Sequence, residues 1–151
     1  MLELKIRPGA GIGPVNLGAT RREVRTALAA IDIALRRQSD GLDYFDSIQV
    51  EYKSERATFI GVSWSNAYVT TYMGVNVFDV TAESLFSLFA THDASGDHTF
   101  NEYEYLFPKQ ILTLWDADSQ YDRIGGEQRV VWAQVGIGND DYLRAIEKIK
   151  G

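Results

Sequence analysis

The chain has 151 residues and a formal net charge of −6, from 15 Lys and Arg against 21 Asp and Glu. This length suits one domain with a sizeable core, and the absence of cysteine excludes disulfides and thiolate metal sites. The acidic balance argues against nucleic acid or an anionic membrane as the main partner. Because no apolar run approaches a membrane span and no signal-peptide pattern is visible, we expect a cytoplasmic protein.

The first predicted helix begins at Thr20, after a short strand over residues 2–6 and a run of turn-forming glycines and prolines. Thr20 and Glu23 have the spacing of a capping box, in which each side chain accepts a hydrogen bond from the other residue's backbone. We expect this helix to run to about residue 34. Its apolar residues recur at helical spacing: Val24, Ala27, Leu28 and Ile31. Its arginines fall off that stripe and are expected in water: Arg21, Arg22 and Arg25.

The rest of the chain reads as strands separated by two further helices. Residues 36–43 are expected to form a loop. Alternation of apolar and polar residues then predicts strands over 48–52, 58–64, 68–77 with a bulge at Gly74, 102–107, 111–115 and 129–137. A second helix is predicted over 82–91, capped by Thr81. Asp140 and Asp141 favour the start of a final helix, whose apolar stripe is Leu143, Ile146 and Ile149.

The two halves of the chain resemble each other at an offset of 61 residues. Gly13 then matches Gly74, the cap Thr20 matches Thr81, and the apolar positions of both helices coincide. Further on, residues 60–62 match 135–137 at an offset of 75, which implies an insertion of 14 residues near 116–127. We therefore predict an α+β fold in one domain, built from two tandem helix-plus-antiparallel-sheet halves (residues 10–72 and 73–138) with a C-terminal helix.

The stretch Leu17-Gly18-Ala19-Thr20-x-x-Glu23-Val24-x-x-x-Leu28, followed by antiparallel strands, resembles the helix-then-sheet unit of the beta-lactamase-inhibitor-protein (BLIP) fold. SmpA/OmlA-type lipoproteins use the same unit. The chain is also similar to small uncharacterised bacterial proteins with Ile-Gly-x-Val-x-Leu-Gly-x-Thr near the start and Gly-Val-x-Val-Phe at mid-chain. The resemblance implies a scaffold that binds other proteins through its sheet face, and it implies no catalytic residue.

One polar stretch, residues 93–104, has the oxygen spacing of a twelve-residue calcium loop. The candidate ligands are Asp93, Ser95, Asp97, Thr99 through its carbonyl, Asn101 and Glu104. Against this reading, His98 occupies the position that requires glycine, and the exit segment contains Pro108. The alternative is a polar surface loop, in which both histidines of the chain, His92 and His98, are simply solvated. Calcium is the one cofactor that this pattern suggests, and otherwise none is expected.

The inferred insertion is acidic and carries aromatic residues. Its candidate partner-binding residues are Trp115, Asp116, Asp118, Tyr121 and Asp122. Tryptophan and tyrosine are typical of binding hot spots, and carboxylates steer a basic partner. The main hypothesis is thus a non-enzymatic protein-binding module, of the inhibitor or immunity type, for a basic target. Calcium binding is one alternative, and a small hydrolase or small-ligand binder with an unidentified pocket is the other.

Overall fold

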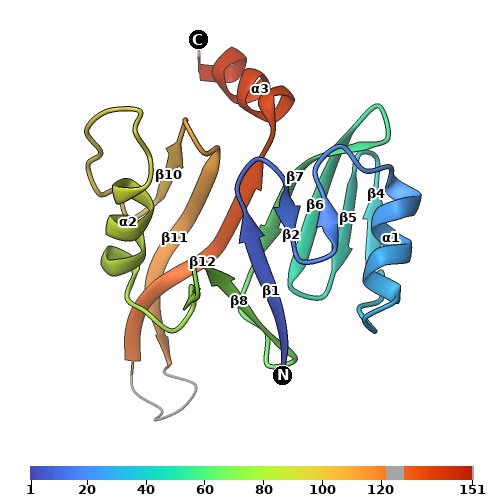
Figure 1. Cartoon of the computed structure of the whole chain (residues 1–151), viewed down its shortest axis with the longest axis horizontal. Coiled ribbons are helices and arrows are strands. Elements are labelled where there is room, and N and C mark those ends of the chain that lie inside the picture. Colours follow the sequence, from blue (N-terminus) through green and yellow to red (C-terminus); the bar gives the residue numbers. More distant parts are fainter. Residues whose placement is uncertain (122–127, 151) are drawn as a thin grey trace.

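In the described part of the chain, a large β-sheet is covered by a small β-sheet with helices α1 (Arg21–Ala29) and α2 (Ala82–Thr91) at either side of it, and a third helix lies at the C-terminus (Figure 1). The computed structural model describes residues 1–121 and 128–150. This arrangement confirms the predicted α+β class and the C-terminal helix. Within those residues, none of the helices combines the length and the apolar character needed to cross a membrane.

Within the described residues, the large sheet has seven strands, all antiparallel to their neighbours. In spatial order they are β10 (Glu104–Phe107), β11 (Leu112–Tyr121), β12 (Gln128–Gly138), β7 (Arg56–Val62), β6 (Ile48–Lys53), β5 (Leu42–Phe45) and β4 (Arg37–Ser39). The two predicted halves meet where β7 pairs with β12, and there Gly61 lies opposite Gly136. The matching segments found in the sequence are thus neighbours in one sheet.

The small sheet has five strands and contains one parallel pair. Its spatial order is β3 (Val15–Asn16), β2 (Gly11–Ile12), β1 (Leu2–Arg7), β8 (Tyr68–Tyr72) and β9 (Val75–Asn76). The parallel pair is β1 with β8, where Leu4 faces Thr70. The first strand of the chain is therefore joined directly to a strand that follows β7.

Two of the three helices begin at the threonines that the sequence indicated. Thr20 caps α1 (Arg21–Ala29), where its Oγ accepts from the Glu23 N–H and Glu23 accepts from the Thr20 N–H. Thr81 caps α2 (Ala82–Thr91) through the Ser84 N–H. The last helix is α3 (Asp140–Lys150), with Asp140 and Asp141 in its first turn.

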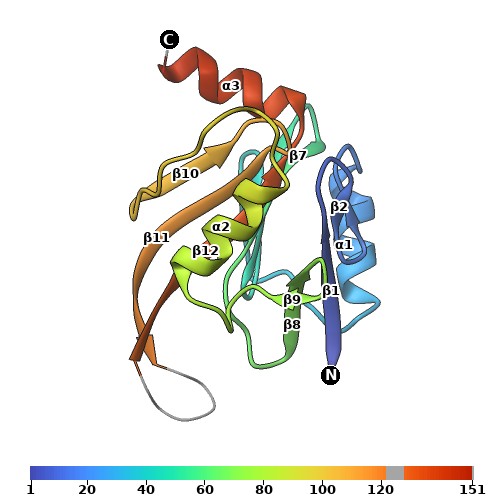
Figure 2. The ribbon, with the colours of Figure 1, turned by 60° about the vertical axis from the view of Figure 1, so that its left-hand side comes forward.

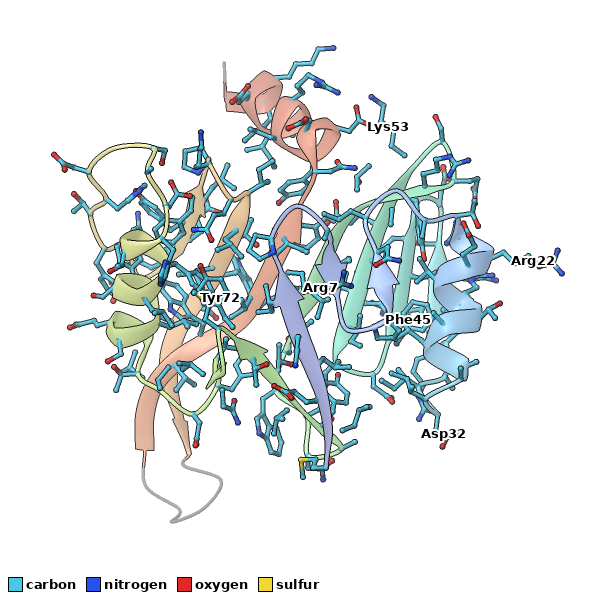
Figure 3. The ribbon with its side chains drawn as sticks, in the orientation of Figure 1. Arg7, Arg22, Asp32, Phe45, Lys53 and Tyr72 are labelled. Atoms are coloured by element: carbon cyan, nitrogen blue, oxygen red, sulfur yellow. The ribbon has the colours of Figure 1, made fainter. Side chains whose placement is uncertain are left out.

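The core lies between the large sheet on one side and α1, α2 and the small sheet on the other (Figures 1 and 2). Alternate residues of the large sheet enter it, such as Val50, Ile60 and Val135, each fully buried. In Figure 3 the Phe45 side chain lies in this layer, whereas Arg22 extends away from α1. Helix α3 packs on the opposite, outer face of the large sheet, where Tyr142 stacks on Phe59 with ring centroids 4.6 Å apart.

Three local predictions were wrong. Residues 36–43 form most of a hairpin, β4–β5, because Gly41 adopts a positive φ that permits a tight turn. Helix α1 ends at Ala29, since Ile33 turns into the core after Asp32 takes a left-handed conformation. The strand expected over 68–77 breaks at residues 73 and 74, both with positive φ. The division into halves at residues 10–72 and 73–138 stays a prediction.

Candidate binding groove

An open cavity of about 630 Å³ lies on the outer face of the large sheet, beneath α3. We call it the outer groove. The sheet supplies its floor, α3 covers one side and the loop of residues 95–101 forms another side. Among the residues that line it are Glu51, Phe59, Asp97, Glu104, Trp115, Gln134, Tyr142 and Glu147.

Glycines in the two central strands form the floor of the groove. A Cβ added to Gly136 would lie 2.5 Å from Cζ of Phe59, and one added to Gly61 would lie 2.7 Å from Cδ of Gln134. Glycine weakens a strand, so its presence at paired central positions needs a packing reason. Here it allows the Phe59 ring and the Gln134 side chain to lie flat across the sheet. A Cβ on Gly138 would meet the Tyr142 ring at 2.4 Å, so the same argument explains how α3 approaches.

The charged side chains that line the groove are mainly acidic. Among the described residues, its lining includes four carboxylates, Glu51, Asp97, Glu104 and Glu147, and no lysine or arginine. Burial raises the pKa of Glu51, an effect that the hydrogen bond from Gln49 only partly opposes. Burial and the carboxylates of Glu51 and Glu104 raise the pKa of Tyr142 to about 12. Among the described lining residues, no lysine or arginine offsets the charge of these carboxylates.

The whole chain shows the same asymmetry. Residues 1–72 contain nine Lys and Arg and eight Asp and Glu, whereas residues 73–151 contain six and thirteen. The net negative charge thus belongs to the second half, which supplies most of the lining of the groove. This imbalance is a signal that can be read from the sequence, and it indicates the half that would attract a cationic partner.

Of the predicted partner-binding residues, Trp115 lies in the groove and is 53% exposed. Asp116 and Asp118 follow on β11, where Asp116 has a positive φ of 54°. The side chain of Tyr121 and the whole of Asp122 lie outside the described residues. The lining residues that sequence reasoning missed come from β6, β7 and α3, namely Glu51, Phe59 and Tyr142.

The predicted calcium loop is organised by a buried carboxylate. Asp93 is 3% exposed; its Oδ1 accepts from the Ser95 N–H at 3.1 Å and its Oδ2 from the Gln110 N–H at 3.0 Å. Burial alone would raise the pKa of Asp93, but the hydrogen bonds from Ser95 and Gln110 lower it. Asp97, Thr99, Asn101 and Glu104 are exposed. Among the described residues, no three His, Cys, Asp or Glu side chains form a group suited to a metal ion. Calcium binding remains a prediction.

Ser95, His98 and Asp93 come together, but not as a catalytic triad. In a triad the serine and the aspartate contact opposite nitrogens of the histidine. Here Ser95 Oγ and Asp93 Oδ1 both face Nε2 of His98, at 3.4 and 3.5 Å, and the serine hydroxyl donates to the aspartate. Nδ1 of His98 instead contacts the Tyr105 hydroxyl at 2.8 Å. These contacts attach the loop to β10. In this arrangement His98 does not orient Ser95 as a nucleophile.

The arginines of α1 were expected in water, but a second buried carboxylate binds two of them. Asp43 is fully buried on β5 and accepts hydrogen bonds from Arg21 and Arg25, each through an Nη2 at 2.8 Å, and from the Tyr52 hydroxyl at 3.0 Å. Burial alone would raise the pKa of Asp43, but these bonds lower it to about 2. Of the three arginines, Arg22 alone is fully in solvent. This cluster fastens α1 to the sheet.

Comparisons of the chain with protein-family models, with curated proteins and with solved structures found no match. The resemblance to the BLIP unit thus remains a prediction.

Proposed function

We propose that the protein is a non-enzymatic, cytoplasmic binding module whose outer groove accepts a lysine- or arginine-bearing segment of another protein. The observation that carries this proposal is the lining itself, whose described residues include four carboxylates and no lysine or arginine. Complementary charge steers such a partner to the groove and disfavours acidic ones. A module of this kind acts by covering a basic surface, as an inhibitor or immunity-type protein does.

The dimensions of the groove favour a protein segment over a small molecule. Its lining extends from Glu51 on β6 to Glu104 on β10. These strands are separated by β7, β12 and β11, so the sheet spans four interstrand spacings, about 19 Å, between them. Several residues of an extended chain are needed to reach both carboxylates.

The apolar part of the lining suits the stems and charged heads of basic side chains. Trp115 and Tyr142 present aromatic surface beside the carboxylates. Aromatic faces attract ammonium and guanidinium groups, and tryptophan and tyrosine dominate many binding energies. Long basic side chains also pack their methylene groups on apolar surface. Charge and apolar contact therefore favour the same class of ligand.

Glu51 gives this proposal its sharpest test. Because its pKa is raised in the folded state, the charged form of Glu51 is less stable there than in the unfolded chain. At neutral pH its carboxylate therefore destabilises the fold, and this penalty disappears as the pH falls below the raised pKa.

We predict that Glu51→Gln raises the Tm at pH 7 and weakens binding of a basic peptide about three- to tenfold. The probe is a capped seven-residue peptide of alternating lysine and valine, and its affinity is measured by isothermal titration calorimetry. Glu55→Gln is the matched control, because Glu55 lies outside the groove with a 70% exposed side chain. It should change neither quantity. Equal binding of a glutamate–valine peptide, or no binding of the lysine–valine peptide, would refute the proposal.

A further inference from the structure

Trp115 and Glu104 lie side by side at one end of the outer groove. They are directly opposite each other in the antiparallel pair of β10 and β11, and both line the cavity. Leu114, the residue before Trp115, is buried in the core, so Trp115 projects from the opposite, outer face of the sheet. Residues paired in this way share a face, with Cβ atoms about 4.5–5.5 Å apart. An indole and a carboxylate are therefore neighbours there.

The indole of Trp115 is left uncovered on its other side. Gln134 is its partner on β12, but the Gln134 side chain extends away from it. Its Nε2 donates to Oε1 of Gln49 on β6 at 3.4 Å, and a Cβ added to Gly61 on β7 would lie 2.7 Å from its Cδ. Gln134 thus crosses β7 toward β6, which is consistent with the 53% exposure of Trp115.

The backbone holds this pair in place before a ligand binds. Beyond the paired residues of β10 and β11, the Asp116 N–H donates to the Tyr103 carbonyl and the Ala117 N–H to the Glu102 carbonyl, each at 2.8 Å. The two chain segments are therefore joined on both sides of the pair. Because the spacing of the indole and the carboxylate is set in the free protein, less ordering is needed when a ligand binds.

A carboxylate beside an exposed indole suits a guanidinium better than an ammonium. The planar guanidinium stacks on an aromatic face and can donate two parallel hydrogen bonds in its own plane to a carboxylate. The ammonium of lysine is a compact and more strongly hydrated charge, and it cannot make both contacts in this form.

From these observations we infer that Glu104 and Trp115 form an arginine-selective subsite at the β10 end of the outer groove. This inference rests on the proposed function and specifies which basic side chain the segment places there. The subsite takes one side chain, so the rest of the segment can still cross the sheet to Glu51. At that end Phe59 lies opposite Glu51 and is only 3% exposed beneath Tyr142, so arginine gains no comparable stacking surface.

The experiment compares the lysine–valine peptide with the same peptide in which arginine replaces every lysine, using isothermal titration calorimetry. The arginine–valine peptide should bind the unmodified protein about three- to tenfold more tightly. Trp115→Leu and Glu104→Gln should each bring the ratio of the two affinities to within about twofold of one. Both positions are exposed, so the variants should keep the Tm of the unmodified protein.

Two further variants serve as controls. Glu51→Gln should weaken both peptides and leave the ratio of their affinities unchanged, because Glu51 lies at the other end of the groove. Trp64→Leu is matched to Trp115→Leu, since Trp64 is 40% exposed and does not line the groove. It should change neither affinity.

The outcomes separate this inference from the proposed function. If the two peptides bind the unmodified protein alike, or if the preference for arginine survives in both Trp115→Leu and Glu104→Gln, the arginine subsite is wrong. The proposed function would still stand in either case, provided that Glu51→Gln weakens both peptides. If neither peptide binds, both are wrong.

Discussion

Asp43 connects α1 to the large sheet through hydrogen bonds from Arg21 and Arg25. We therefore expect that replacing its carboxylate with an amide lowers the free energy of unfolding substantially. In Asp43→Asn, the guanidinium groups of Arg21 and Arg25 would stay largely buried, 15% and 34% exposed, without a carboxylate. Breaking a buried pair in this way costs about 3–5 kcal/mol of unfolding free energy. Chemical denaturation at pH 7 measures it.

Asp46→Asn is the matched control, because Asp46 pairs with Arg36 at a similar 2.7 Å but with both side chains well exposed. It should cost at most about 1 kcal/mol. The contribution of Asp43 should also depend on acidity. Its folded pKa of about 2 lies below the usual value near 3.9, so its stabilisation is complete above about pH 4 and is lost as the pH falls toward 2. Equal losses in the two variants would contradict this account.

Gly136 tests whether glycine is required for the floor of the groove. In Gly136→Ala the new Cβ would lie 2.5 Å from Phe59 Cζ and 2.8 Å from Thr113 Oγ1, so the ring must move. We expect a loss of about 1–3 kcal/mol, measured by thermal denaturation. Adding Phe59→Leu should recover part of it, giving a coupling energy of about 1 kcal/mol in a double-mutant cycle. Additive effects would show that the ring is not the obstacle.

Thr→Ala substitutions should have opposite effects on stability at the helix caps and in the interior of α1. Thr20→Ala and Thr81→Ala each remove an oxygen that accepts from a first-turn N–H, and each should cost about 1 kcal/mol. Thr26→Ala, at an exposed interior position of α1, should instead be neutral or slightly stabilising, because alanine is the better helix former. Denaturant midpoints compare the three. A harmless Thr81→Ala would mean that α2 is positioned by packing alone.

At the scale of the whole molecule, the charge asymmetry predicts how binding responds to salt. The groove is open to solvent, so dissolved salt screens the electrostatic attraction between its carboxylates and a basic partner. Raising sodium chloride from about 50 to about 500 mM should weaken the lysine–valine peptide about tenfold, chiefly by slowing association. Stopped-flow fluorescence or calorimetry reports the change. An affinity independent of salt would contradict an electrostatic role for Glu51 and Glu104.

Much of the fold could be predicted from the sequence because its signals are local. Thr20 and Thr81 satisfy N–H groups within three residues of themselves, and the strands alternate apolar and polar side chains regardless of their partners. The α+β class and the start of each helix followed from such patterns. The break at residues 73 and 74 did not, since it depends on the positive φ of Met73, which is unusual for a residue with a side chain and has no signature in the sequence.

The groove itself was decided by the tertiary structure. Glu51, Glu104 and Tyr142 lie on three separate elements, and they come to one face only because β7 pairs with β12 and α3 returns over the sheet. Likewise, Arg21 and Arg25 look solvated on a helical wheel, but Asp43, 22 and 18 residues away, draws them inward. Sequence patterns determine which residues can be buried or capped nearby, whereas long-range pairing determines which charges meet.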